Sequence, residues 1–335
     1  MSMVWTRINT LLLLLVLFAL LGVIAMLAAR TEGGPLDPTG PPSSTQRTSI
    51  TSLPYTITQP GSYYLTADLV GVAGQNGITV GADDVTIDLN GFTLRGAIGS
   101  LDGIFAAGIR TNLTVRNGVV KDWGEEGIGG SGSEIRDALI SDITVSGNSG
   151  TAIRINNGVV TNCNLVDNGA GLHILGGEHG SHVSHCSARQ NAFFGFTLFG
   201  GSTIEQCTSA DNGSDGIRLS FAGTVRGCVV MNNGNDGIDV TGHTLVTDNV
   251  AYSNGLGAGD GAGIHASGAG NYIVGNTASL NDRGIDVDVA DNVIDRNSAF
   301  GNTTNFDFAA GNVEGIFVSP ATVDTATNPY SNYLP

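Results

Sequence analysis

The feature that most constrains the fold of this chain is a short repeat that recurs over most of its length. Its signature is a Gly-Ile-x-Val pattern, and most neighbouring copies are 21 residues apart, with a few at 24 or 26. The copies begin at Gly77, Gly171, Gly195, Gly216, Gly237, Gly263 and Gly284. Helical repeats such as the type of about 34 residues need a longer period. Apolar and polar residues alternate within each copy, which predicts short strands with one buried face.

Two further columns of residues keep a constant offset of five along the repeat. The first column is Asn90, Asn117, Ile143, Cys163, Cys186, Cys207, Cys228, Asn249, Asn276 and Asn297. The second is Asn148, Asn168, Asn191, Asn212, Asn233, Asn254, Asn281 and Asn302. Asn side chains stacked on parallel strands can bond one another from level to level. The sequence therefore predicts an all-β fold, a single-stranded right-handed parallel β-helix of about ten rungs spaced about 4.8 Å apart.

The regions outside the repeat suggest the domain organisation. Residues 1–30 predict a signal peptide or a membrane anchor helix, because Leu11 to Ala29 runs without a polar side chain. Cleavage and retention of this leader both remain open, and both predict a secreted, periplasmic or cell-surface protein. Residues 31–48 predict a flexible linker, 49–70 an amino-terminal cap, 71–312 the β-helix and 313–335 a carboxy-terminal cap or tail.

The charge balance excludes some partners. The formal net charge is −16, and Lys121 is the one lysine. Such a chain repels nucleic acid and anionic membrane surfaces. Membrane contact is expected only through residues 8–29, if the leader stays uncleaved. An extracellular glycan is the partner that we expect.

The four cysteines all fall in one column, 23, 21 and 21 residues apart. They predict a buried stack of small side chains. Stacked cysteines are also close enough for disulfides in an oxidising compartment, so Cys163–Cys186 with Cys207–Cys228, or Cys186–Cys207 alone, are alternatives. An in-line column does not suit tetrahedral metal binding.

The x position of the repeat points outward, because its neighbours point into the core. This column reads Arg154, His173, Thr197, Arg218, Asp239, His265, Asp286 and Asp307. A uronan lyase or epimerase needs a base, and a cation beside the sugar carboxylate. Arg218 could bind that acid group, and His265 or His173 could move the proton.

The same column offers other chemistry. Asp286 and Asp307 could hold Ca²⁺ through oxygen ligands. A hydrolase would instead pair two carboxylates, for which Asp239 and Asp286 are the candidates, about 9.6 Å apart along the backbone. Arg154 is a candidate for sugar binding in the same column. The alternative is a ladder of surface charges that compensate one another from rung to rung.

Two smaller motifs carry further candidates. His179, His182 and His185 lie close together after His173, which suggests a copper or zinc site, with a polar surface turn as the alternative. Trp123 lies in a loop beside Glu125 and Glu126, where it could stack on a sugar or anchor the loop.

The stretches Tyr55-Thr-Ile-Thr-Gln-Pro-Gly-Ser-Tyr-Tyr-Leu and Asp84-Val-Thr-Ile-Asp-Leu-Asn-Gly-Phe-Thr-Leu precede the Asn-rich rungs. Together they resemble exported parallel β-helix repeat proteins of the pectin-lyase-like class, which includes NosD-like periplasmic proteins. The resemblance implies the fold but several activities. A protein that binds and processes an extracellular polysaccharide, as a lyase, epimerase or hydrolase, is one expectation. A non-catalytic scaffold or adhesin, and a NosD-like accessory protein for metal-centre maturation, are the others.

Overall fold

The computed structural model describes residues 47–130, 132, 135–176, 180–255, 261–319 and 329–334. These residues belong to one compact unit, Arg47–Pro335, and form a right-handed parallel β-helix without an α-helix in the described part. Among them no helix is long and apolar enough to cross a membrane. The predicted leader at 1–30 lies outside the described residues, so it stays a prediction.

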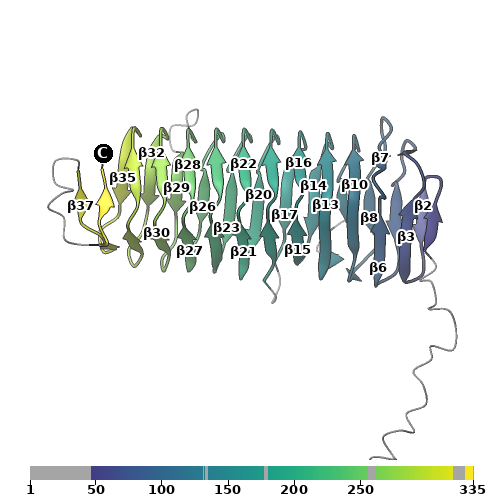
Figure 1. The fold of residues 1–335 in the computed structure, drawn as a ribbon, viewed down its shortest axis with the longest axis horizontal. Helices are drawn as coiled ribbons and strands as arrows, with labels where there is room; N and C mark the ends of the chain where they lie inside the picture. The colour runs from purple at the N-terminus through teal and green to yellow at the C-terminus, as the bar shows by residue number, and fades with distance from the viewer. Residues whose placement is uncertain are drawn as a thin grey trace, which may run out of the picture. The chain divides into compact units, whose positions relative to one another are not determined.

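One face of the β-helix is a parallel sheet that takes one strand from every rung, here called the site sheet (Figure 1). Each strand pairs in register with the strands of the rungs before and after it, as Ile217 does with Phe196 and Ile238. Its twelve strands are β2 (Tyr55–Ile57), β5 (Ile78–Val80), β8 (Ile104–Ala106), β11 (Ile128–Gly130), β14 (Thr151–Ile155), β17 (Ala170–Ile174), β20 (Phe196–Phe199), β23 (Ile217–Ser220), β26 (Ile238–Val240), β29 (Ala262–Ala266), β32 (Arg283–Val287) and β35 (Thr304–Phe308).

The remaining faces form one 24-stranded sheet, here called the rear sheet, because the long strands β10 and β13 run through both of them. Its strands are β1 (Thr48–Ile50), β3 (Gly61–Leu65), β4 (Leu69–Val70), β6 (Val85–Asp88), β7 (Thr93–Arg95), β10 (Thr114–Lys121), β13 (Ala138–Ser146), β15 (Gly158–Thr161), β16 (Asn164–Val166), β18 (His182–Ser184), β19 (Ser187–Arg189), β21 (Ser202–Glu205), β22 (Thr208–Ala210), β24 (Gly223–Arg226), β25 (Val229–Met231), β27 (Thr244–Thr247), β28 (Val250–Tyr252), β30 (Tyr272–Val274), β31 (Thr277–Ser279), β33 (Val293–Asp295), β34 (Ser298–Phe300), β36 (Val313–Glu314), β37 (Phe317–Val318) and β38 (Asn332–Tyr333). A separate pair joins β9 (Arg110–Thr111) to β12 (Ile135–Arg136).

The predicted fold is confirmed, with twelve strands in the site sheet where ten rungs were expected. The expected number came from counting ladder residues at regular spacing. The two terminal rungs have no ladder residue at that spacing. The first rung holds β2, within the region predicted as a cap. The last rung holds β35, and its ladder residue is Asn332, which accepts a bond from the Asn297 amide at 3.1 Å although 35 residues separate them.

The two predicted ladders stabilise the turns from inside. In the second ladder each side-chain amide donates to the next side-chain oxygen, as Asn212 does to Asn233 at 2.9 Å. The first ladder contains the four cysteines, all free and buried. There the Cys186 amide donates to the Cys207 sulfur at 3.4 Å. A thiol therefore occupies the acceptor position that an Asn side chain holds in later rungs.

Two members of the predicted first column lie elsewhere. Asn90 and Asn117 are exposed and adopt left-handed backbone angles, with φ of 55° and 60°. Gly118, not Asn117, pairs with Ile143. Asn is the residue type that tolerates this conformation best after glycine, so turn geometry explains these two residues and not the ladder.

Candidate functional site

The outward x residues form a continuous column along the site sheet, here called the outer column. Register pairing runs from Arg154 to His173, Thr197, Arg218, Asp239, His265, Asp286 and Asp307. The expected order of neighbours is therefore present. Asp239 lies between Arg218 and His265, and Asp286 lies beside Asp307.

A second column, here called the inner column, precedes the outer one by three residues in each rung. Its members stand directly before the Gly of the repeat and include Asp102, Glu126, Phe194, Asp215, Asp236 and Arg283. Asp102, Asp215 and Asp236 are each no more than 5% exposed. Buried carboxylates without partners are costly, so each requires bonds from its surroundings.

Arg218 connects the two columns. Its Nη2 lies 2.6 Å from Asp215 Oδ2, and its Nε lies 2.8 Å from Asp239 Oδ2. Its guanidinium carbon also lies 4.7 Å from the centre of the Phe194 ring. Its Nε donates a hydrogen bond to Asp239, its Nη2 forms an ion pair with Asp215, and the two carboxylates neutralise the cation in place.

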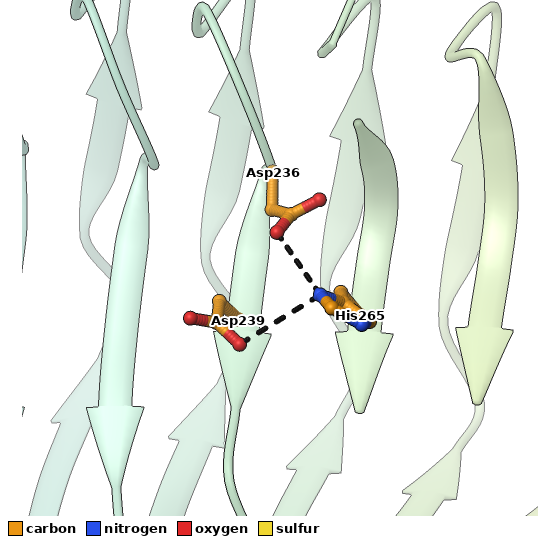
Figure 2. A group of neighbouring side chains, drawn as sticks. All are labelled: Asp236, Asp239 and His265. Atoms are coloured by element: carbon orange, nitrogen blue, oxygen red, sulfur yellow. Dashed lines mark hydrogen bonds and ion pairs between the residues drawn. The ribbon is translucent and has the colours of Figure 1, made fainter. Parts of the chain in front are cut away.

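His265 is the centre of the cluster (Figure 2). Its Nδ1 lies 3.1 Å from Asp236 Oδ2 and 3.9 Å from Asp239 Oδ1, from the neighbouring strand. Its Nε2 lies 3.1 Å from Asp288 Oδ2. The Ala262 amide donates to the second Asp236 oxygen at 2.7 Å, which fixes that carboxylate.

The surroundings raise the proton affinity of both His265 and Asp239. The hydrogen bond that His265 donates to Asp236 raises the pKa of His265 to about 10 against the opposing effect of burial. Burial raises the pKa of Asp239, the Asp215 charge adds to this, and Arg218 opposes it. His265 is therefore an imidazolium at neutral pH, able to donate a proton. Asp239 is a more basic carboxylate than an exposed one.

Aromatic residues lie next to this cluster toward the amino end. A cavity of about 220 Å³ is lined by Thr151, Ala170, Leu172, His173, Phe193, Phe194 and Thr197. Phe193 is 62% exposed. His173 is half-buried, and burial lowers its pKa, with the Arg154 charge adding to the effect. Neutral aromatic faces of this kind suit stacking on sugar rings.

A larger recess of about 390 Å³ follows at the amino end of the same face. It is lined by Asp102, Phe105, Gly124, Glu125, Glu126, Gly130, Ser149, Gly150 and Arg154. Arg154 Nη1 lies 2.8 Å from Glu126 Oε1. The two hollows and the central cluster thus follow one another along a single face.

Trp123 does not lie on this face, so of the two alternatives for it, stacking on a sugar is wrong and an anchoring role agrees with its burial. It is 1% exposed, and its indole nitrogen donates to the Leu94 carbonyl at 3.2 Å. Its ring fills the core beside Gly71 and Gly77, where an added Cβ would come within 2.6 Å of the ring. The acidic residues that follow Trp123 are typical of a surface loop, although its own ring anchors the core.

Asp286 and Asp307 share a protein cation. Arg283 Nη1 lies 2.6 Å from Asp286, and its Nε lies 3.4 Å from Asp307. The guanidinium offsets one of the two negative charges, and the Ca²⁺ site expected at these residues stays a prediction. The residue groups of the described chain that could hold a metal both contain His265, with Asp236 and Asp239 or with Asp286 and Asp288. An imidazole must lose its proton before it can bind a metal, and these carboxylates hold that proton in place.

His182 and His185 lie away from the site sheet. His182 belongs to β18 of the rear sheet, with its Nε2 at 3.4 Å from Glu205 Oε1, and His185 follows in an exposed turn. His179 lies outside the described residues. The potential metal groups found among the described residues contain neither His182 nor His185.

Sequence analysis missed the inner column and the aromatic pair. The signal for the column is present, since Asp102, Glu126, Asp215 and Asp236 all stand directly before Gly-Ile. Acidic residues beside glycine are also typical of turns, so this column was not recognised as a possible site. Phe193 and Phe194 stand where the next two rungs have Ser-Asp and Asn-Asp. Two large aromatic residues at an exposed turn are unusual and indicate a binding surface.

The family described as the right handed beta helix region matches residues 70–208, 102–249 and 200–329. This chain belongs to the right-handed β-helix family. No curated protein sequence matches this β-helix chain.

Solved β-helix structures extend the comparison. The A-module of the mannuronan C-5 epimerase AlgE6 from Azotobacter vinelandii is 12% identical, with a TM-score of 0.50 and coverage of 86% of this chain and 87% of its own. A variant of the periplasmic alginate epimerase AlgG is 12% identical, with a TM-score of 0.54 and coverage of 84% and 75%. Identities this low establish a shared fold, and the activity must be argued from the site.

Proposed function

We propose that this chain is a polysaccharide-binding β-helix that processes its glycan on the outward face of the site sheet. The observation that carries the proposal is the cluster of Arg218, Asp239 and His265 on successive rungs, with buried Asp215 and Asp236 behind it. The aromatic cavity beside the cluster supports it, because a sugar chain can stack there and continue onto the charged residues. The similarity to structures of alginate epimerases agrees with this function.

The proposed chemistry is proton transfer by Asp239 and His265. Asp239 accepts a proton from the water that attacks the anomeric carbon. The imidazolium of His265 donates a proton to the glycosidic oxygen as the bond from that carbon breaks, with Asp236 and Asp288 holding the ring in place. Asp286 is the second carboxylate on the same column, next to His265. A protonated group beside a carboxylate is what acid–base cleavage of a glycosidic bond requires.

The position of Arg218 favours hydrolysis over elimination or epimerisation. Those two reactions need a cation that is free to bind the uronate carboxylate. In this chain Asp215 and Asp239 bind the guanidinium from two sides. The apolar segment of residues 11–29 supports export, so the glycan that we propose is an extracellular one.

A glycan screen tests the proposed reaction. The purified protein would be incubated with uronans, neutral glycans and amino glycans, and products would be followed by reducing ends, by ultraviolet absorbance of unsaturated sugars and by NMR of C5 configuration. New reducing ends without unsaturation support hydrolysis. Unsaturated or epimerised products would replace the hydrolytic mechanism, and the absence of any product would contradict processing.

A non-catalytic scaffold or adhesin is the second candidate. The observation in its favour is that every cation named in the two columns contacts a carboxylate, as Arg154, Arg218, His265 and Arg283 do. Such pairing is also what a structural ladder of compensating charges needs. A β-helix of this type would bind glycans in the screen without changing them.

A further inference from the structure

The recess at the amino end of the site sheet has the shape of a notch. Phe105 pairs with Gly129, and Ile128 pairs with Ile153, so Gly129 falls between Phe105 and Arg154 in the outer column. Gly129 contributes no side chain at that level. An aromatic ring on one side and a guanidinium on the other are therefore two rungs apart, about 9.6 Å along the backbone.

Glu126 lies at the base of this notch because position 129 is glycine. A Cβ at Gly129 would lie 1.8 Å from Glu126 Oε2, so any side chain there would displace the carboxylate. The Gly130 amide donates to the same oxygen at 3.2 Å, and Arg154 binds the other oxygen at 2.8 Å. The Glu126 amide in turn donates to Asp102 Oδ1 at 2.7 Å. Hydrogen bonds thus connect Asp102, Glu126 and Arg154 within the recess.

The charge of the recess is negative. Asp102, Glu125 and Glu126 line it together with a single cation, Arg154, which Glu126 already binds. A sugar carboxylate would meet net repulsion here, because three acidic residues outnumber the one guanidinium and Glu126 already contacts its Nη1. Sugar hydroxyls or an ammonium group would instead donate hydrogen bonds to the carboxylates, and the ring would stack on Phe105.

We propose that this recess is a second binding site, which takes a pyranose without a carboxylate and binds an amino sugar most strongly. This inference rests on the proposed function only in naming the class of glycan that the face binds. It sets this chain apart from the alginate epimerases that share its fold, since alginate is a uronan.

Proton binding at Asp102 gives the site a pH dependence. Burial raises the pKa of Asp102 to about 6, the hydrogen bond from the Glu126 amide and the Arg154 charge oppose this, and the Glu125 charge adds to it. Burial also raises the pKa of Glu126, against the effect of Arg154. The recess therefore gains negative charge as the pH rises through about 6, and the affinity for an ammonium sugar increases over that interval.

Binding of three oligosaccharides of equal length tests the inference on the full chain. Calorimetry would compare oligomers of glucosamine, glucose and mannuronate at pH 5 and pH 7. We expect the glucosamine oligomer to bind best at both pH values, and the mannuronate oligomer to bind at least about tenfold more weakly. Equal or tighter binding of mannuronate, or no binding of any oligomer, would overturn the proposal.

Variants assign the binding to the recess. Glu126→Gln leaves Arg154 unpaired, so it should weaken glucosamine binding by about tenfold and improve mannuronate binding. Phe105→Ala should weaken the binding of all three oligomers, and Gly129→Ala should resemble Glu126→Gln. Glu205→Gln is the matched control, because Glu205 also pairs with an arginine, Arg226, but on the rear sheet. Unchanged binding in folded Glu126→Gln and Phe105→Ala proteins would refute the site.

The two proposals fail separately. If the glucosamine oligomer binds through Glu126 but no glycan is processed, the recess stands and the proposed reaction falls. If a uronan is processed and Glu126→Gln changes neither affinity nor selectivity, the proposed function stands and this inference falls.

Discussion

At the scale of single residues, His265 links the proposed catalytic site to the stability of the fold. Three carboxylates surround its ring, two of them within hydrogen-bonding distance. The folded protein therefore binds the imidazolium proton much more tightly than the unfolded chain does. The same proton that we assign to catalysis also stabilises the fold.

This linkage predicts a loss of stability at alkaline pH. The pKa of His265 rises from 6.5 to about 10 on folding, so its contribution is complete below pH 6.5 and is lost as the pH rises through 10. We expect it to be on the order of a few kcal/mol. Urea unfolding between pH 6 and pH 10 should show a decline that His265→Gln largely removes. Parallel curves for both proteins would contradict the assigned environment.

Asp102 has a linkage of the same sign as His265, but at lower pH. Its pKa rises from 3.8 to about 6 on folding, so its stabilising contribution is present below pH 3.8 and is lost as the pH rises through 6. We expect Asp102→Asn to increase the free energy of unfolding at pH 7 by roughly 1–3 kcal/mol, because it removes a buried charge and keeps an acceptor for the Glu126 amide. It should weaken amino-sugar binding at the same time. Chemical denaturation checks the first effect, and a net loss of stability would mean that the charge is compensated.

Single residues also show what the sequence could predict about the site. The outer column was visible, because a fixed period places the x residues above one another whatever their chemistry. Asp215 and Asp236 were not recognised, since Asp before Gly is typical of turns and their burial depends on the neighbouring rung. The choice between the two roles of Trp123 could not be made for a related reason, because the glycines that make room for its ring come from rungs before its own.

At the scale of elements, the ladders carry much of the stability of the turns. The Asn212 amide donates to the Ala188 carbonyl, to Ser209 and to Asn233, while its oxygen accepts from Asn191. Replacing it leaves several buried groups without partners. We expect Asn212→Ala to cost roughly 2–4 kcal/mol in unfolding free energy, and Cys207→Ala, which removes one weak acceptor, roughly 1–2 kcal/mol. Denaturant titration compares them, and equal costs would count against the ladder as the cause.

The cysteine segment of the first ladder has a chemical readout. All four thiols are free and no more than 2% exposed. The unfolded protein, prepared without reductant, should react with four equivalents of a thiol reagent, and the folded protein should react slowly if at all. Two equivalents or none in the unfolded state would point to the disulfides that the stacked spacing also allows.

The elements also explain why the number of rungs was underestimated. Internal rungs repeat at nearly constant length, so their ladder residues are recognisable from spacing alone. The terminal rungs end against different surroundings, and Asn332 reaches its ladder position from a distant part of the sequence. Periodicity cannot predict a contact that breaks the period.

At the scale of the β-helix unit, one face carries a continuous series of surfaces. The recess at Phe105 and Arg154, the aromatic cavity at Phe193 and the cluster at His265 succeed one another on consecutive strands of the site sheet. Arg154 and Asp239 are four rungs apart, about 19 Å along the axis. An extended glycan that lies across the strands would therefore contact all three.

The most direct test of this account compares glycan processing by three proteins: the wild type, Asp239→Asn and Asp295→Asn. Asp295 is the matched control, an Asp that pairs with an arginine, Arg296, on the rear sheet. The account predicts that the wild type and Asp295→Asn process the same glycan at equal rates, and that Asp239→Asn loses roughly 10²-fold or more while remaining folded. Full activity in Asp239→Asn, or no processing of any glycan by the wild type, would contradict it.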